Sequence, residues 1–405
     1  MKKQISLFLV LVLLFTSVGA LASSKKETKV QPNKYSLALE GVVLQDTPDR
    51  GITPATPAVR HEMVAGESPT TGLPWEGSYL PMIVQISNPA GSVKFNGTTV
   101  KSAGLGVRSP WSGQYADVVF EGILYRTGET RISFLLSDCF ADGQPTGGVG
   151  PVRSARIGHV LLREEWQSGF IYAGGPRRED NNIKELFKQT GADEKGVLFD
   201  LLSGSFKENK NRVKGIKAPD NYNADVMGLR SLIPAQYVST PRPFLFADDS
   251  PYVQGNYDMA YTINLDWGKK EYISHFQYDE NENLYLRFCG PGDDPTKWAP
   301  YMSYAGSEQR DEGSMEQLSF ANLIIQRVHY DYVNNNKIMP NMQAVGKGNA
   351  DIFIGGRYIP GYWVRNGEQE PTVFYDDQGN ELVLTRGKTF IAHFPPESLC
   401  TITAQ

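Results

Sequence analysis

Hydrophobic and polar positions follow two different patterns along this chain of 405 residues. Between residues 76 and 205, short apolar runs that predict strands alternate with two segments of helical period. The predicted strands cover 81–87, 116–124, 131–136, 170–173 and 197–201, and the predicted helices cover 151–166 and 182–190. Strands that alternate with helices indicate an α/β domain with a mixed sheet.

From residue 255 to residue 405 the apolar runs are short and are separated by polar turn segments, with no helical period between them. This pattern predicts a β-rich antiparallel domain. Residues 206–254 are richer in Lys, Asn and Pro and are expected to connect the two domains. The predicted fold class is therefore α+β, with an N-terminal α/β domain followed by the β-rich domain.

The first 22 residues have the pattern of a secretory signal peptide. Lys2 and Lys3 precede an apolar run, and Ala20 and Ala22 fit a cleavage site before Ser23. An uncleaved anchor is the alternative, but the apolar run is short for a membrane span. Residues 23–75 are poor in large apolar side chains and are expected to form an exposed linker. The mature protein is thus expected to be secreted or extracytoplasmic and not membrane-spanning.

Charge and cysteine content narrow the possible partners. Removal of Lys2 and Lys3 takes the net charge from −5 to −7, and no basic tail is present, which argues against nucleic acid as a partner. No cysteine precedes Cys139, so no lipid anchor is predicted. Cys139, Cys289 and Cys400 permit at most one internal disulfide, and the sequence leaves open whether two of them pair. Buried, inert thiols are the expectation for all three.

A glycine-rich segment, 147–150, leads into the first predicted helix. We expect Gly150 to cap a helix that begins near Pro151, a residue that suits the first helical position. Arg153 and Arg156 would then lie in its first turns, where positive charge opposes the helix dipole. Both arginines are therefore expected to face an acidic partner or a bound anion.

Carboxylates and arginines on the neighbouring strands complete a candidate site, in which Glu121 would orient the arginines toward a carboxylate or phosphate ligand. The alternative is an internal salt-bridge network that fixes the glycine loop on the sheet. His159, one turn beyond Arg156, could serve as a general base, although a structural role is the commoner one for a helical histidine. The predicted ligand-binding residues are Asn88, Asp117, Glu121, Arg131, Arg153, Ser154, Arg156, Gly174 and Gly175.

An ordered set of short segments between residues 68 and 395 carries a resemblance to a known family. They are Ser68–Pro74, Pro81–Asn88, Tyr115–Glu121, Thr130–Arg131, Gly150–Arg156, Ala173–Gly175, Tyr278–Asp279, Tyr285–Arg287, Ala321–Gln326, Val345–Gly348, Gly361–Trp363 and Gly387–Thr389. Together they resemble the YerB-like family, whose members are described as bacterial lipoproteins with a two-part domain of unknown function. The resemblance implies architecture and an envelope location more than chemistry. The chain departs from the family in lacking the lipid-bearing cysteine.

Two functions remain open. The first is a non-catalytic binding or scaffold protein of the bacterial cell envelope, with an anion-recognising site and an unidentified envelope component or protein as its partner. The second is a hydrolase or transferase that acts on an envelope polymer and uses Glu121, with or without His159, as acid or base. The sequence contains no Walker loop, Gly-x-Ser-x-Gly elbow or His-Glu-x-x-His motif, so no cofactor or metal is expected. The sequence does not decide whether the protein is an enzyme.

Overall fold

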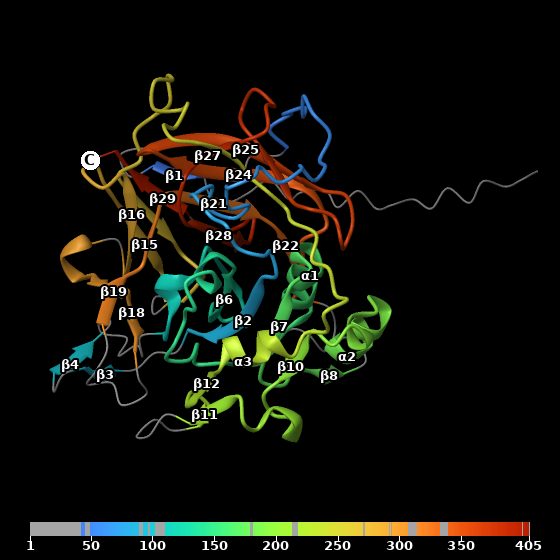
Figure 1. Ribbon diagram of the computed structural model, residues 1–405. Helices are drawn as coiled ribbons and strands as arrows, with labels where there is room; N and C mark the ends of the chain where they lie inside the picture. Colours follow the sequence, from blue (N-terminus) through green and yellow to red (C-terminus); the bar gives the residue numbers. More distant parts are fainter. Residues whose placement is uncertain are drawn as a thin grey trace, which may run out of the picture. The chain divides into compact units, whose positions relative to one another are not determined.

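The largest element of the fold is a mixed sheet whose ten strands come from both halves of the chain (Figure 1). The computed structural model describes residues 42–44, 49–88, 92–95, 98–101, 110–178, 181–212, 218–269, 272–290, 292, 294–306, 314–332, 339–398 and 400–404. Across the sheet the order is β10 (Leu198–Asp200), β7 (Gly169–Tyr172), β2 (Met82–Ser87), β6 (Thr130–Leu136), β5 (Val118–Ile123), β28 (Thr389–Phe394), β21 (Asn322–Arg327), β24 (Gly346–Ile354), β25 (Arg357–Arg365) and β26 (Val373–Tyr375).

The centre of this sheet joins the two predicted domains. Strand β5 pairs in parallel with β28, so that Val118 lies opposite Thr389 and Gly122 opposite His393. The division into an α/β domain at 76–205 and a β-rich domain at 255–405 is therefore not confirmed, because backbone hydrogen bonds continue across it. The described residues belong to one compact unit, residues 32–405.

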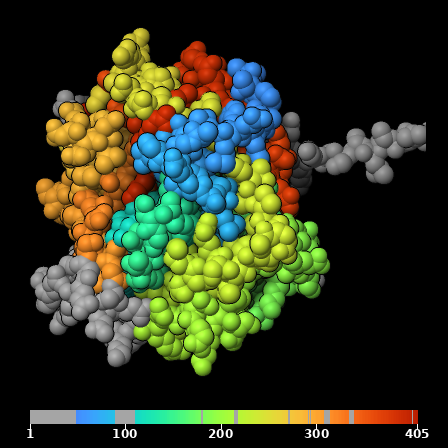
Figure 2. All heavy atoms as spheres, in the orientation of Figure 1, coloured from blue at the N-terminus to red at the C-terminus, as the bar shows by residue number. Residues whose placement is uncertain are grey.

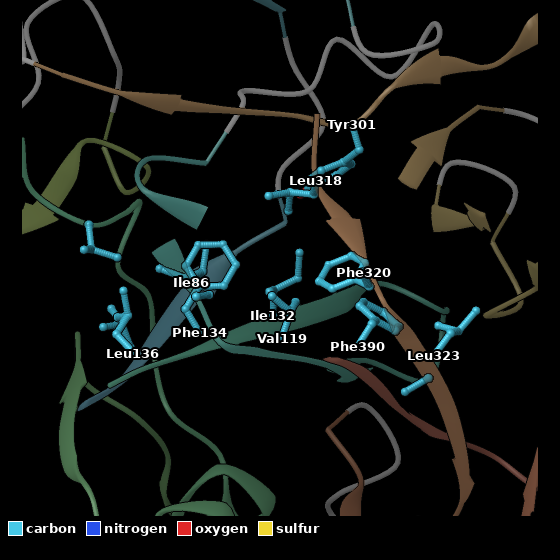
Figure 3. Packing of buried hydrophobic residues seen from close by; sticks show 14 of the residues in the cluster. Ile86, Val119, Ile132, Phe134, Leu136, Tyr301, Leu318, Phe320, Leu323 and Phe390 are labelled. Carbon is cyan, nitrogen blue, oxygen red and sulfur yellow. The ribbon is translucent and has the colours of Figure 1, made fainter. Parts of the chain in front are cut away.

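A second sheet is antiparallel throughout and is built mainly from the C-terminal part of the chain, as the pattern of short strands predicted. Its strands are β1 (Val42–Leu44), β29 (Cys400–Thr403), β14 (Thr262–Leu265), β15 (Ser274–Asp279), β16 (Leu284–Cys289), β17 (Ala299–Pro300) and β20 (Ser319–Phe320). Side chains of both sheets form one hydrophobic core. Val119, Ile132, Phe320 and Phe390 lie close together in it (Figure 3).

A second core lies on the opposite face of the ten-stranded sheet. Helices α1 (Ile157–Trp166) and α2 (Ile183–Gln189) supply side chains to it, whereas α3 (Val226–Ser231) packs into the first core. Helix α2 begins where the sequence predicted, with the Asn182 side chain accepting the backbone N–H of Lys184. None of the helices in the described part of the chain is long and apolar enough to cross a membrane.

Helix α1 begins six residues later than predicted, with Arg156 rather than Gly150 as its N-cap. The preceding segment is held extended by backbone hydrogen bonds to neighbours: Val152 N–H donates to Tyr222 O at 2.8 Å, and Arg153 N–H donates to Gln85 O at 2.8 Å. These amides are therefore not available for a helical turn. Proline at position 151 fits this extended segment because its ring fixes φ but does not require a helix.

The described part of the expected linker packs on the rest of the chain. In Figure 2 residues 49–88, in blue, lie against segments in red and yellow. Arg50 donates to the Ala350 carbonyl at 2.5 Å, and the Phe244 N–H donates to the Pro69 carbonyl at 3.2 Å. The predicted signal peptide and its cleavage site lie outside the described residues.

Short two-stranded ribbons and 3-10 turns connect the main elements. The ribbons are β3 (Ser92–Phe95) with β4 (Thr98–Lys101), β8 (Arg177–Arg178) with β9 (Asn181–Asn182), β11 (Lys210–Arg212) with β12 (Tyr222–Ala224), β13 (Leu245–Ala247) with β27 (Val383–Thr385), β18 (Met302–Ala305) with β19 (Ser314–Gln317), and β22 (His329–Asp331) with β23 (Asn341–Gln343). Cys289 and Cys400 are buried, and Cys139 is partly buried.

Candidate functional site

A pocket lies at the N-terminus of α1, where several distant segments of the chain meet. Its walls come from β5, β6, the first turns of α1, the β22–β23 ribbon and β28. The space in it that water can occupy is small, about 20 Å³, and it is partly open to solvent. The polar lining residues are Arg131, Ser133, Arg156, His159, Tyr330 and His393.

Two glycines allow the β22–β23 ribbon to pack closely against β5 and α1 at this pocket. Gly122 on β5 faces Tyr330, and a Cβ atom at position 122 would lie 2.8 Å from the tyrosine hydroxyl. Gly158 in the first turn of α1 faces Met342, and a Cβ there would lie 2.8 Å from the methionine Cε. Distances this short require the neighbour to move, so larger residues would push the β22–β23 ribbon away from the pocket.

Arg131 extends from β6 into the pocket and is only 3% exposed. Its Nη1 donates to the Ser154 carbonyl at 3.0 Å, whereas its Nε is buried and has no hydrogen-bond partner. A buried donor without a partner costs free energy, so its presence calls for a physical reason.

Arg156 reaches the pocket from the N-cap of α1 and is partly exposed. Its Nη1 donates to the Ala155 carbonyl at 2.7 Å, and its Nε is again buried without a partner. No aspartate or glutamate of the described residues lies within 4.0 Å of the charged nitrogens of Arg131 or Arg156. The two guanidinium groups thus share a pocket that supplies no ion-pair partner.

Burial lowers the pKa of both Arg131 and Arg156. Burial, followed by the charges of Arg156 and Arg153, lowers the pKa of Arg131 to about 9. Burial also lowers the pKa of Arg156. Since Arg131 remains charged at neutral pH, the pocket carries uncompensated positive charge there.

Two histidines complete the polar wall. His159 Nδ1 accepts the backbone N–H of Arg156 at 3.1 Å, which leaves the proton of the neutral ring on Nε2. Burial and the nearby Arg131 and Arg156 charges lower the pKa of His159, and burial lowers that of His393 to about 4. Both rings are therefore neutral at pH 7 and can donate, but add no charge.

Glu121 lies on the opposite face of the sheet and does not contact these arginines. Its carboxylate pairs with Arg287 Nη2 at 2.7 Å. It also accepts hydrogen bonds from Thr130 Oγ1 at 2.6 Å, Ser274 Oγ at 2.8 Å and Asn88 Nδ2 at 3.2 Å. The expectation that Glu121 orients Arg131, Arg153 and Arg156 is therefore not what the structure shows. Successive side chains of a strand point to opposite faces, and Glu121 and Arg131 occupy different ones.

Comparison with known proteins identifies the family. A family model described as the N-terminal domain of a protein of unknown function, DUF3048, matches residues 104–238, and the model of its C-terminal domain matches residues 263–391. The chain belongs to the DUF3048 family. No curated protein matches the sequence.

The fold agrees with this assignment to the DUF3048 family. The crystal structure of the YerB protein from Bacillus subtilis is similar, with a TM-score of 0.57 and 19% sequence identity, over 81% of this chain and 96% of that one. The resemblance to the YerB-like family is therefore confirmed. At this identity the similarity establishes the fold alone.

In this DUF3048 chain Asn88 belongs to the Glu121 cluster rather than to the pocket. Its Nδ2 donates to Thr130 Oγ1 at 2.8 Å, and its Oδ1 accepts from the Tyr301 hydroxyl at 2.9 Å. Its amide thus links strands from both family-model regions.

Asp117 holds the loop that precedes the first strand of the sheet. Its Oδ2 accepts from Thr70 Oγ1 and from the Asp138 backbone N–H, both at 3.1 Å. Asp138 in turn accepts from Ser68 Oγ at 2.7 Å and Thr71 Oγ1 at 2.6 Å. Burial and the neighbouring Asp138 raise the pKa of Asp117 well above its usual range. This arrangement fixes residues 68–71 and is separate from the pocket.

The other predicted site residues surround the pocket without lining it. Arg153 Nη1 pairs with Asp220 Oδ1 at 2.7 Å, and both side chains are partly exposed. Ser154 contributes the carbonyl that accepts from Arg131. Gly174 N–H donates to Asp200 Oδ1 at 2.8 Å, and a Cβ on Gly175 would lie 2.2 Å from Ile183 Cδ1. The last two positions therefore serve loop geometry.

Sequence reasoning missed the far wall of the pocket. His393 and Tyr330 reach it only because β28 pairs with β5 and because the Tyr330 hydroxyl donates to the His393 carbonyl at 2.8 Å. Positions 120 and 393 are distant in sequence, yet the Phe120 and His393 rings stack with centroids 5.7 Å apart. No local sequence pattern predicts the parallel pairing of β5 with β28.

Proposed function

We propose that this protein is an exported, non-catalytic binding protein of the bacterial cell envelope, and that the Arg131–Arg156 pocket recognises an anionic group of its partner. The observation that carries the proposal is that Arg131 and Arg156 line one pocket and have no ion-pair partner among the described residues. An anionic ligand would supply the missing negative charge.

The alternative of an internal salt-bridge network has little support at this pocket. The pleat of β5 directs Glu121 to the other face of the sheet, where Arg287 pairs with it. Asp220, the acidic partner of Arg153, has no ion pair with Arg131 or Arg156 among the described residues. Among the described residues the two pocket arginines therefore have no acidic partner, which supports a group from outside the chain as their ligand.

A hydrolase or transferase that uses Glu121 is less well supported. This carboxylate is 1% exposed and its two oxygens already accept four hydrogen bonds. A general acid or base must reach the proton that it transfers. Glu121 would have to lose its structural partners to do so.

The test is anion-dependent stabilisation. Phosphate or sulfate should raise the melting temperature of the full chain, because a ligand that binds only the folded state stabilises it. Arg131→Gln should abolish this increase, whereas Arg153→Gln, which removes an equal charge outside the pocket, should keep it. An equal increase in all three proteins would show that the effect is not due to the pocket.

The envelope location has its own test. Intact-mass measurement of the exported protein should give a chain that begins at Ser23 and carries no acyl group. A retained apolar run or a lipid adduct would contradict this part of the proposal.

A further inference from the structure

The size of the Arg131–Arg156 pocket restricts the anionic group that can enter it. This inference rests on the proposed function and specifies the chemical class of that group. Water can occupy about 20 Å³ of the pocket, and about 10–15 Å³ of such space holds one water molecule. The pocket therefore has room for one or two oxygen-sized atoms, and the rest of a ligand must lie outside it.

Three residues that line the pocket each have a donor that no described group accepts. Arg131 uses Nη1 for the Ser154 carbonyl, and its Nη2, unlike its Nε, remains open to solvent. The Gly158 N–H lies in the first turn of α1, where amides lack an intrahelical acceptor, and no other described group accepts it. The neutral His159 ring carries its proton on Nε2. These donors come from β6 and α1 and meet at one pocket.

The charge at the pocket is positive. Arg131 and Arg156 have no ion-pair partner among the described residues, and Arg131 is only 3% exposed, so water solvates its charge poorly. The N-terminus of α1, a helix of ten residues, adds the positive end of its dipole. A water molecule would fit the space but would leave this charge uncompensated, so a small anion is the better ligand.

Size and charge favour different anions. Phosphate carries more negative charge than a carboxylate at pH 7, so charge alone would rank phosphate first. A phosphoryl group, however, brings three terminal oxygens in a tetrahedral arrangement, whereas a carboxylate is flat and has two. In a space of about 20 Å³ the flat group can enter, and the tetrahedral group would stay partly outside.

From these features we infer that the anionic group recognised by this pocket is a carboxylate, supplied by an acidic amino acid or an acidic sugar of the partner. One carboxylate oxygen accepts from Arg131 Nη2, and the other accepts from the Gly158 N–H and His159 Nε2. The remainder of the partner lies outside the pocket.

The experiment is an NMR titration of the full chain at pH 7 and constant ionic strength with formate, chloride, inorganic phosphate and sulfate. The Gly158 amide and the Arg131 side-chain signals report binding at the pocket. We expect formate to bind at least about tenfold more tightly than each of the other three, because chloride is a single atom that cannot meet all three donors and the tetrahedral anions do not enter fully.

Three variants locate the site. Arg131→Gln should weaken formate at least about tenfold, because a hydrogen bond between charged groups is lost. His159→Phe, which removes the Nε2 donor, should also weaken it. Arg153→Gln removes an equal charge outside the pocket and should leave the affinity within about twofold.

Titration with N-acetylglutamate and glucuronate distinguishes the two sources of the carboxylate. Tighter binding of the first supports an acidic amino acid, and tighter binding of the second supports an acidic sugar. If formate binds and neither of these does, a carboxylate on a larger molecule cannot reach the donors, and the inference is wrong.

The outcomes also separate this inference from the proposed function. If phosphate or sulfate binds as tightly as formate and the binding is lost in Arg131→Gln, the preference for a carboxylate is wrong but the anion site stands. Equally tight chloride binding would also contradict a carboxylate-specific site. If none of the anions shifts the Gly158 or Arg131 signals of the folded protein, the inference and the proposed function both fail. Circular dichroism of every variant shows whether it has folded.

Discussion

On one face of strands β5 and β6, Glu121 and Arg287 form a buried ion pair that three further side chains complete with hydrogen bonds. On the opposite face, Arg131 and Arg156 approach each other in a pocket without a carboxylate among the described residues. We call the Glu121–Arg287 group the closed cluster and the Arg131–Arg156 group the open cluster; they lie on opposite faces of the same two strands.

The difference separates two reasons for burying an arginine. A buried ion pair whose carboxylate accepts several further hydrogen bonds fixes how the strands of the two sheets meet, at a modest net free energy. A buried guanidinium without an acidic partner is unfavourable in the free protein. Groups of the second kind concentrate at functional sites, where a ligand supplies what the protein lacks.

The closed cluster should give the largest effect on stability. Arg287→Met would leave the Glu121 carboxylate buried without its cation, so the free energy of unfolding should fall by about 3–5 kcal/mol. Urea denaturation at pH 7 measures this change. The double variant Glu121→Gln with Arg287→Met should recover part of the loss. A fall of less than about 1 kcal/mol in the single variant would mean that the Glu121–Arg287 pair does not hold the two sheets together.

The open cluster should behave in the opposite way. Arg131→Met removes a buried charge that has no ion-pair partner, so the free energy of unfolding without added anion should fall by no more than about 1 kcal/mol. At phosphate concentrations near 100 times the dissociation constant, the natural protein should gain roughly 2.7 kcal/mol, and the variant should not. Denaturation curves with and without the ligand measure both quantities. A large loss without ligand would assign Arg131 a structural role.

Asp117, unlike Glu121, is a buried carboxylate without an ion-pair partner among the described residues. Because burial raises its pKa in the folded state, its protonated form favours folding, and this contribution is lost as pH rises through the folded-state pKa. Asp117→Asn should therefore raise the stability at pH 7–8. The difference should disappear below the unfolded-state pKa of about 3.9. Thermal melting across this pH range measures the effect. A variant that is less stable than the natural protein at pH 8 would contradict it.

Arg153 should give the smallest effect. Its pair with Asp220 is partly exposed, so Arg153→Gln should change the free energy of unfolding by at most about 1 kcal/mol. Salt should reduce even this difference, because exposed ion pairs are screened. Urea denaturation at low and high salt gives the comparison. A fall in the free energy of unfolding as large as that of Arg287→Met would contradict the expectation that a partly exposed ion pair contributes little to stability.

The sequence predicted the strands around the site but not their partners. Apolar runs located β2, β5, β6 and β7 closely, because local side-chain periodicity reports burial. The pairing of β5 with β28 joins residues far apart in the chain, and no local pattern specifies it. That pairing, rather than any linker, explains why the two halves share one sheet.

The sequence predicted part of the candidate site. Arg131 and Arg156 line the same pocket, but Arg153, which was predicted to join them, pairs with Asp220 outside it. The start of α1 depends on backbone hydrogen bonds to Gln85 and Tyr222, which the proline and glycine residues of this segment do not predict. The sequence also did not show that Glu121 and Arg131 lie on opposite faces of the sheet. The register of β5 with β6 shows it: Arg131 lies opposite Gly122, and the side chain of the preceding residue, Glu121, points to the other face.

The most direct test of the central claim is the NMR signal of the arginine Nε–H groups during titration of the folded protein with phosphate. The account predicts that the Arg131 and Arg156 signals shift in a saturable way. The Arg153 and Arg287 signals should stay in place, although Arg287 Nε is also without a partner, because its guanidinium lies over the Tyr301 ring at 4.1 Å in the closed cluster. Unchanged Arg131 and Arg156 signals at saturating ligand, or equal shifts of all four, would contradict the claim.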